Sequence, residues 1–450
     1  MIKSRQIMVY ILVFITIAMP TSMAYARSRS VIDRLQSQIS YQWKLKNGKH
    51  SAFKVHVYIS VPTTRDHQIV SDIEIIPKPI AYLDDEFDQK IACIELVDVA
   101  PGQEINICWN AKVTTIDKNY NIDPAKTKGF EHIPDDIIKL YTKDEDKYCL
   151  NSPVIKEAAK EASKGEKKPY WIAKNVLDYV HSRIRYEMDG RHDNIEQILL
   201  NGKGSCTEFA VLFEALCRAN GLPAINVLGT KCRDNGIDKL FHKWSKVYIP
   251  PYGWIPFDAT GGYFGRDRSK ALILGIRGSK SEYLNWNSHF ITANKDGKIS
   301  KKEISYAAYS DRSCGLGGLG GYAVWLDQES GFIVNSSHDH LKADGKSNSI
   351  ITATMKTPLG KPISDLDVQI TLSKGKGTIS SVESHPDGTY TATYTAPMEP
   401  CNETITVNVL GLSKSVEIKS DNISHFQRFK FLYLSFIVAQ AIGLALLLNS

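Results

Sequence analysis

The stretch Gly204-Ser205-Cys206-Thr207-Glu208-Phe209-Ala210 decides the fold of the central part of the chain. From Cys206 onward, apolar residues recur at three- and four-residue steps, which indicates a helix, and Asn220-Gly221 supplies its stop signal. Gly204 permits a tight turn before that helix. The pattern predicts that Cys206 lies at the positive helix end, where the dipole and free backbone N–H groups favour the thiolate. The alternative is a small apolar residue at the start of a core helix.

Two later stretches favour the chemical interpretation of Cys206. The run from His242 to Pro250 alternates like a strand, and the run from Gly253 to Thr260 is a second short segment of β type. If these strands form a hairpin, Asp258 can lie beside His242. A thiol nucleophile needs a base to take its proton and a third group to orient that base. Cys206, His242 and Asp258 are therefore the candidate catalytic residues.

These motifs resemble those of the transglutaminase-like cysteine enzymes. The family pattern G-x-C-x-x-F-A, followed by R-x-x-G-L-P-A, is matched from Gly204 to Ala224. The patterns H-x-W-x-x-V-Y-I-P and G-W-I-P-F-D-x-T are matched at 242–250 and 253–260. One departure is Lys246, where many members carry an acid, which puts a neighbouring charge contact in doubt. The resemblance covers residues 169–262 and implies a papain-like core in which the three candidates form a Cys-His-Asp triad.

The ends of the chain carry signals for export and for anchoring. Residues 1–26 have a basic start, an apolar core and the small-residue site Ala24-Tyr25-Ala26, which predicts a signal peptide, with an uncleaved anchor as the alternative. Residues 431–448 carry no charge and are just long enough to span a bilayer. We expect an exported protein held to the membrane by this C-terminal helix, although a removable sorting tail also fits.

Two further regions alternate like strands. Residues 41–118 predict a small β-sandwich, in which a hairpin from strand 91–97 to strand 105–109 would place Cys93 opposite Cys108. That register allows a disulfide, and two buried free thiols are the alternative. Residues 347–418 hold short strands separated by turn signals, as in a sandwich. This stretch is similar to bacterial immunoglobulin-like repeats of cell-surface proteins, which implies a spacer or adhesive stalk.

Composition and motifs exclude several other classes. The 450 residues carry a formal net charge of +6, and no dense basic patch is interleaved with aromatic residues, so we expect no nucleic-acid partner. The eight cysteines form no C-x-x-C pair, so we expect no metal site and no cofactor. Residues 289–304 are spaced like parts of a calcium loop. Because Thr292 stands at the first ligand position, a hairpin turn at Asp296-Gly297 explains them better, and calcium is not expected.

The sequence thus predicts an α+β fold: a papain/transglutaminase-like core, with the Cys-bearing helix packed on an antiparallel sheet bearing His and Asp, flanked by two all-β sandwich domains. The expected reaction is hydrolysis of a peptide or side-chain amide bond in a protein or peptide substrate, through an acyl-enzyme. The alternatives are a protein-crosslinking transglutaminase and an inactive cell-surface binding protein.

The backbone N–H of Cys206 is one expected oxyanion donor. Trp244 and Trp254 are each either walls of the site or core aromatics. The expected order is 1–26 signal peptide, 27–118 β domain, 119–168 polar connector, 169–310 catalytic domain, 311–346 Gly-rich linker, 347–420 immunoglobulin-like sandwich and 431–448 membrane segment.

Overall fold

The computed structural model describes residues 34–47, 53–144, 147–188, 194–277, 289–293, 310–311 and 316–422. The expected signal peptide and the expected membrane segment lie outside these residues, as do Cys314 and most of the stretch considered for calcium. In the part of the chain that is described, no helix is both long enough and apolar enough to cross a membrane.

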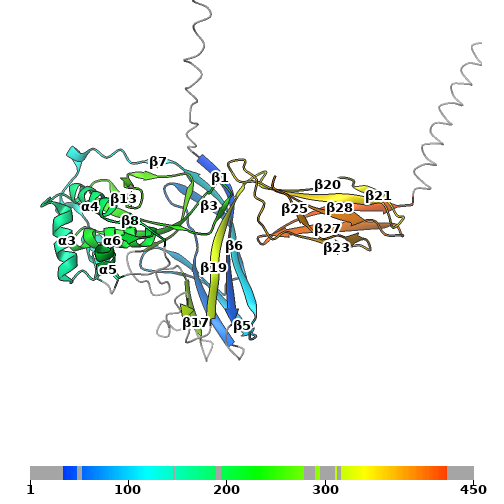
Figure 1. Cartoon of the computed structure of the whole chain (residues 1–450), viewed down its shortest axis with the longest axis horizontal. Helices are drawn as coiled ribbons and strands as arrows, with labels where there is room; N and C mark the ends of the chain where they lie inside the picture. Colours follow the sequence, from blue (N-terminus) through cyan, green and yellow to red (C-terminus); the bar gives the residue numbers. More distant parts are fainter. Residues whose placement is uncertain are drawn as a thin grey trace, which may run out of the picture. The chain divides into compact units, whose positions relative to one another are not determined.

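Two antiparallel sheets are built mainly from the strands that precede the helices (Figure 1). The larger has the order β11-β19-β1-β6-β3, with β18 also paired to β19, and the smaller has the order β17-β2-β5-β4. In β1, Leu35, Ile39 and Leu45 are buried, as expected for one face of a strand packed on a core. The strands are β1 (Arg34–Asn47), β2 (Phe53–Ser60), β3 (Gln68–Ile76), β4 (Ala81–Asp84), β5 (Lys90–Val99), β6 (Glu104–Ile116), β11 (Ile237–Asp238), β17 (His289–Ala293), β18 (Ser310–Asp311) and β19 (Leu316–Asp327).

Strand β19 occupies part of the stretch that we expected to be a glycine-rich linker. It pairs with β1 along its length, from Ser37 opposite Asp327 to Asn47 opposite Leu316. The physical reason is the apolar run 323–326, in which all four side chains are buried. A run buried on both faces belongs in the interior of a sheet rather than in an exposed connection.

The predicted hairpin between the two cysteine-bearing strands is wrong. β5 pairs with β2 and β4, whereas β6 pairs with β1 and β3, so Cys93 and Cys108 lie in different sheets. Both thiols are free and buried. At the connection, Gly102 N–H donates to the Asn47 carbonyl at 2.8 Å, so the chain is held by the end of β1 and crosses between sheets. The expected register therefore does not form, and neither does its disulfide.

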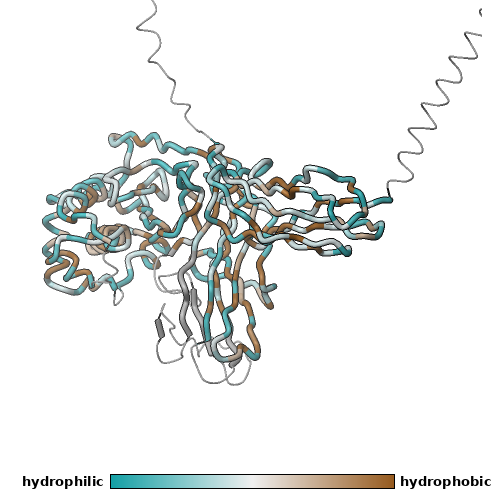
Figure 2. The backbone as a smooth tube through the Cα atoms, turned by 45° about the vertical axis from the view of Figure 1, so that its right-hand side comes forward, coloured by the Kyte–Doolittle hydropathy of each residue, from teal (hydrophilic) through white to brown (hydrophobic). Residues whose placement is uncertain are grey.

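The helices form one group and share one core (Figure 1). In α6, every residue from Glu208 to Arg218 is buried, which is typical of a helix surrounded by other elements. Figure 2 shows hydrophobic stretches in these helices and in the long strands, whereas the loops that join them are mostly hydrophilic. The helices are α2 (Asp135–Tyr141), α3 (Pro153–Ser163), α4 (Pro169–Arg183), α5 (Ile195–Asn201) and α6 (Cys206–Ala219), with short 3-10 turns η1 (Pro124–Lys126) and η2 (Phe130–His132).

The sheet beside these helices carries the remaining site motifs. Its strand order is β14-β13-β12-β10-β16, with antiparallel pairing throughout. Its apolar residues Val247, Ile249, Ile255 and Phe257 belong to the same core as α6. Its strands are β10 (Ala224–Lys231), β12 (His242–Ile249), β13 (Gly253–Asp258), β14 (Tyr263–Phe264) and β16 (Ala271–Arg277), and the short strands nearby are β7 (Lys118–Asn119), β8 (Arg185–Tyr186), β9 (Lys203–Gly204) and β15 (Arg266–Asp267).

The C-terminal strands form a second sandwich, whose core cluster also includes Ile237 of β11 and Val324 and Leu326 of β19. One sheet has the order β20-β22-β26-β24, with β25 also paired to β26, and the other has the order β21-β28-β27-β23. Tyr390 and Tyr394 of β26 and Ile405 and Val407 of β27 are buried between them. The fold is therefore α+β with two all-β sandwiches, as expected. The strands are β20 (Phe332–Ser336), β21 (His340–Lys342), β22 (Asn348–Met355), β23 (Gln369–Lys374), β24 (Thr378–Ile379), β25 (Glu383–Ser384), β26 (Thr389–Thr395), β27 (Cys401–Val409) and β28 (Leu412–Asp421).

Candidate active site

Cys206 is the first residue of helix α6, at the position that the periodicity predicts. Ser205 is the N-cap: its hydroxyl accepts a hydrogen bond from the backbone N–H of Thr207 at 3.3 Å. The carboxylate of Glu208 accepts from the backbone N–H of Ser205 at 2.8 Å, which completes a capping box. These contacts fix the first helical turn and therefore the position of the partly exposed Cys206 thiol.

Gly204 is needed for a reason different from the expected tight turn. Its φ is not among the positive values of the described glycines. A Cβ at this position would instead lie 2.4 Å from the Cβ of Glu208. The glycine thus gives the capping carboxylate room to fold back over the helix start.

The hairpin of β12 and β13 brings His242 and Asp258 together. Ser245 of β12 lies opposite Phe257 of β13, so the first residue of one strand lies close to the last residue of the other. The Nε2 atom of His242 lies 2.6 Å from Oδ2 of Asp258, and both side chains are buried. The Cys206 side chain lies near enough to the His242 ring to help raise the pKa of that ring. The three residues predicted from the motifs thus lie together.

The electrostatics of this cluster favour a thiolate–imidazolium pair. Burial alone would raise the pKa of Cys206, but hydrogen bonds from the His242 ring and from the Lys243 backbone bring it below its ordinary value. Burial would lower the pKa of His242, yet the hydrogen bonds with Asp258 and Cys206 raise it. Burial opposes ionisation of Asp258 too, but its bond to His242 lowers its pKa to about 2. Each shift favours the charged form of its residue.

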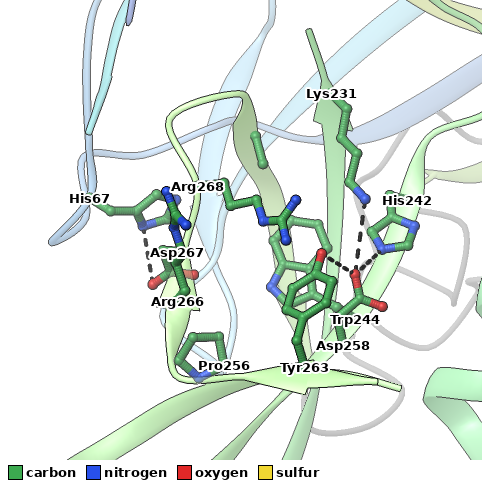
Figure 3. A pocket seen from close by; sticks show the side chains of 11 residues that line it. His67, Lys231, His242, Trp244, Pro256, Asp258, Tyr263, Arg266, Asp267 and Arg268 are labelled. Atoms are coloured by element: carbon green, nitrogen blue, oxygen red, sulfur yellow. Dashed lines mark hydrogen bonds and ion pairs between the residues drawn. The ribbon is translucent and has the colours of Figure 1, made fainter. Parts of the chain in front are cut away.

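Two further contacts to Asp258 were not predicted from the sequence. The Tyr263 hydroxyl donates to Oδ2 of Asp258 at 2.8 Å, and the backbone N–H of Gly261 donates to Oδ1 at 3.3 Å. The ammonium of Lys231 lies 4.0 Å from the same carboxylate (Figure 3). Tyr263 lies five residues after Asp258, so a turn back onto Asp258 is the signal that could have indicated this contact. These donors hold the carboxylate in place for its bond to His242.

Trp244 and Trp254 have different aromatic neighbours. The Trp244 ring stacks near the His242 ring, with centroids 5.8 Å apart, and it lines the hollow beside Asp258. Trp254 packs edge-on against Tyr141 and Tyr248, with centroids 4.9 and 5.5 Å away. Trp244 therefore lines the hollow and also belongs to a core cluster with Ile225, Val227, Ile273 and Ile276, and Trp254 packs against that same cluster.

Lys246, which departs from the family pattern, has an acidic partner of its own. Its ammonium lies 3.2 Å from Oδ2 of Asp267, and both side chains are nearly buried. The same carboxylate accepts a hydrogen bond from the Tyr120 hydroxyl at 3.0 Å. The charge of Lys246 is thus balanced by Asp267 and does not involve the His242–Asp258 pair.

A buried carboxylate on the Cys206 helix was also missed. Glu214 accepts hydrogen bonds from the Tyr148 hydroxyl at 2.9 Å, the Asn226 amide at 3.0 Å and the Ser245 hydroxyl at 2.7 Å. Asn226 belongs to β10 and Ser245 to β12, so one carboxylate ties the helix of the thiol to the strand of the imidazole. Glu214 lies eight residues after Cys206 in a helix whose other residues are mainly apolar. An acid in such a run is the sequence signal that could have indicated a buried polar contact.

The described residues hold no group of three or more His, Cys, Asp or Glu side chains arranged to bind a metal ion. The described site contains a thiol, an imidazole and a carboxylate, on Cys206, His242 and Asp258.

Comparison with known proteins supports two of the regions. Residues 156–259 match the transglutaminase-like superfamily, and residues 329–422 match invasin, domain 3. Uncharacterized proteins of Mycobacterium bovis and Mycobacterium tuberculosis are 29% identical over 154 residues, which is 29% of this chain and 49% of each relative. The chain thus spans about half the length of these curated relatives.

Solved structures also align with the chain. A structure named "putative cysteine protease" from Cytophaga hutchinsonii is 15% identical and covers 67% of this chain and 93% of its own, with a TM-score of 0.48. The Yersinia pseudotuberculosis adhesin InvE is 24% identical over 20% of this chain and 26% of its own, with a TM-score of 0.19. From the family matches, the chain contains a transglutaminase-like domain followed by an immunoglobulin-like domain of the invasin type.

Proposed function

We propose that the chain is a cysteine enzyme of the transglutaminase-like type, which attacks peptide or side-chain amide bonds with Cys206 as the nucleophile. The observation that carries this proposal is the contact of the partly exposed Cys206 thiol with a histidine that is itself bonded to Asp258 at 2.6 Å. Nucleophilic catalysis by cysteine needs this chain of three groups.

The proposed reaction has two halves. The Cys206 thiolate adds to the carbonyl carbon, and the backbone N–H of Cys206 at the helix start is placed to stabilise the oxyanion. The His242 imidazolium then gives its proton to the departing amine as the C–N bond breaks, leaving a thioester. Asp258 holds the ring orientation and stabilises the charged ring throughout.

Release of the acyl group regenerates the thiol. His242, now neutral, takes a proton from the incoming nucleophile, which attacks the thioester carbonyl, and the thiol leaves as thiolate beside the newly charged ring. Water gives a hydrolase, and an amine gives a crosslinked product. We propose hydrolysis as the main outcome, with transfer of the acyl group to an amine as the alternative.

The proposed location is outside the cytoplasm. The match to invasin domain 3 indicates a surface or extracellular protein. The apolar ends at 1–26 and 431–448 supply a proposed export signal and a proposed membrane anchor. The substrate would then be an extracytoplasmic protein or peptide.

The test uses the full chain and the variant Cys206→Ser. A peptide library is incubated with each protein, with and without a biotinylated primary amine, and products are identified by mass spectrometry. Cleavage only by the parent chain supports a hydrolase, and biotin incorporation supports a transamidase. If the parent chain modifies no peptide and Cys206 reacts with iodoacetamide no faster than a free cysteine, the enzyme proposal is wrong and a binding role takes its place.

A further inference from the structure

A fully buried carboxylate lies in the loop that leads to His242. Asp238 is the last residue of β11, between β10 and β12, and it has no exposed surface. Among the described residues, four donors contact its oxygens, two at the end of β10 and two in the loop itself. Since a carboxylate tolerates burial only when its oxygens are hydrogen-bonded, the loop is organised around this side chain.

The four hydrogen bonds are divided between the two oxygens of Asp238. Oδ2 accepts from the Thr230 hydroxyl at 2.9 Å and from the backbone N–H of Lys231 at 2.7 Å. Oδ1 accepts from Nε of Arg233 at 3.0 Å and from the backbone N–H of Leu240 at 3.4 Å. The last of these bonds reaches two residues along the chain and closes an Asx turn. Both ends of the loop are therefore tied to one side chain.

These bonds lie where the pairing of β10 with β12 stops. The register of that pairing ends with Gly229 opposite His242. Two residues further along, the same register would place Lys231 opposite Leu240, and these are the residues whose backbone N–H groups bind Asp238. The carboxylate thus bridges the two chain segments just beyond His242. The backbone of His242 is fixed by the strand ladder on one side and by this bridge on the other.

The residue before His242 has a backbone conformation that needs support. Phe241 has a φ of +40°, in the left-handed region that a residue with a Cβ adopts only at a cost. Its ring packs near the ring of Tyr41 of β1, with centroids 5.7 Å apart, and Leu240 before it is bonded to Asp238. Loss of the bond to Leu240 would let this turn relax, and the imidazole would move with it.

The loop is also held by elements outside the catalytic sheet. The backbone N–H of Trp325 donates to the carbonyl of Gly236 at 2.8 Å, and its indole N–H donates to the Thr230 hydroxyl at 3.2 Å. Ile237 belongs to the core cluster of the second sandwich. Because its neighbours are held in this way, Asp238 provides a fixed point for the turn that follows.

We propose that Asp238 is a positioning residue for His242. Its carboxylate sets the turn by which the chain enters β12, and that turn sets where the imidazole lies relative to Asp258 and Cys206. This assignment rests on the proposed function, in which the imidazole serves the thiol. The same carboxylate holds the backbone of Lys231, whose ammonium lies 4.0 Å from Asp258, so supports of both members of the His242–Asp258 pair meet at one side chain.

The first experiment compares the alkylation of Cys206 by iodoacetamide against pH in the parent chain and in Asp238→Asn. The amide keeps the shape of the side chain but has a single acceptor oxygen, so the turn loses its anchor and the contact of His242 with the thiol loosens. We expect the rate at acidic pH to fall by about tenfold, the order for one charge-assisted hydrogen bond. At a pH where the thiol ionises unaided, the rate should stay at the parent value. A merely structural role would not separate these two pH ranges.

Two variants are matched controls for the loss of an acid. Asp234→Asn removes an exposed carboxylate of the same loop. Glu403→Gln changes a buried carboxylate of the second sandwich that also accepts from two backbone N–H groups. Both should keep the parent pH profile, although Glu403→Gln should lower the free energy of unfolding.

Thr230→Val is a milder test of the same carboxylate. It keeps the shape of a β-branched residue but removes one donor to Asp238. The alkylation profile should therefore shift in the same direction as in Asp238→Asn, by a smaller amount.

The second experiment measures the pKa of His242 by NMR of histidine-labelled protein, with its signal assigned from His242→Gln. Burial opposes protonation of this ring, but its contacts with Asp258 and Cys206 raise its pKa. Because Asp238→Asn loosens those contacts, it should lower that pKa, and the two control variants should leave it unchanged.

The proposal is overturned if Asp238→Asn keeps the parent pKa of His242, or if either control moves that pKa as far. A reactive parent thiol whose pH profile is unchanged in Asp238→Asn also overturns it. If Asp238→Asn does not fold, Thr230→Val decides, and parent values in that variant overturn the proposal. A parent chain whose Cys206 reacts like a free cysteine contradicts the proposed function, while the pKa of His242 in the variants still decides the positioning.

Discussion

At the scale of single residues, the arrangement around Cys206 links geometry to reactivity. The helix start supplies partial positive charge, and the His242 ring supplies a hydrogen bond and a full charge once protonated. These contributions differ in size, because a neighbouring charge shifts a thiol pKa further than a helix dipole at an exposed end does. Reactivity against pH therefore tells which of them controls the thiolate.

The pH dependence of Cys206 alkylation should follow the thiolate–imidazolium pair. Because the pKa of Cys206 is lowered, the thiolate forms as pH rises through a value below that of a free cysteine. Because the pKa of His242 is raised, its ring stays protonated over the same range. His242→Ala should move the rise in iodoacetamide reactivity to higher pH. If the low-pH reactivity is unchanged in this variant, the helix dipole alone sets the thiolate and the Cys–His pair does not exist.

Replacement of Asp258 should be milder than replacement of either partner. Asp258→Asn keeps a hydrogen-bonding group beside His242 but removes the charge, so the ring loses its orienting anion and its pKa falls. Turnover should drop by roughly 10² to 10⁴, with a larger loss in Cys206→Ala and His242→Ala. Steady-state rates of each single variant and of the double variants measure this. The doubles should add little, because the three groups act as one unit, and additive losses would contradict that.

At the scale of elements, the Cys206 helix is joined to the His242 strand by a buried acid as well as by apolar packing. Glu214 has no exposed surface and receives three hydrogen bonds, from Tyr148, Asn226 and Ser245. A buried polar network of this kind is stabilising only while every member has its partner. It also fixes the distance between the two elements that carry the reacting groups.

Glu214→Ala should therefore lower the free energy of unfolding by about 3 to 5 kcal/mol, because three buried donors lose their acceptor together. Glu214→Gln keeps the shape and one acceptor oxygen, so its loss should be smaller. Chemical denaturation followed by fluorescence gives both values. Glu157→Ala is a suitable control, since Glu157 is an exposed acid on α3. A loss in Glu214→Ala no larger than in this control would show that the network does not stabilise the junction.

The elements that could be predicted from the sequence are those whose signals are local. Helix α6 follows from the spacing of its apolar residues, and its cap and stop residues stand beside it in the chain. The β12–β13 hairpin follows from two strand patterns and a short turn. In contrast, the partners of β5 and β6 depend on β2 and β1, far away in the sequence. A turn signal at Pro101-Gly102 fits both a hairpin and a crossing between sheets, so the local sequence does not distinguish the two.

At the scale of the whole described chain, sequence order and spatial order differ. Strand β19 follows the transglutaminase-like domain in the chain but pairs with β1, near the N-terminal end of the described residues. Strand β11, from within that domain, pairs with β19. Domain boundaries that are predicted as consecutive ranges do not represent a sheet that a later segment completes. The N-terminal sheet and the catalytic sheet should therefore unfold together.

Trp325 allows this coupling to be tested. Its side chain is fully buried in β19, and its indole N–H donates at 3.2 Å to the hydroxyl of Thr230 in β10, the strand that ends at Lys231. That hydroxyl in turn donates to Asp238 of β11 at 2.9 Å. Trp325→Ala removes a large buried ring and leaves a cavity, which should lower the free energy of unfolding by about 3 to 5 kcal/mol. Trp171→Ala is the control, because that ring is 40% exposed on α4.

Calorimetry, together with Cys206 alkylation along the thermal transition, gives the measurement. If the sheets are coupled, Trp325→Ala lowers the temperature at which the Cys206 site loses its reactivity at low pH, although the substitution lies in a different sheet. If that temperature stays at the parent value while a separate transition appears below it, the two sheets unfold independently and β19 stabilises only its own.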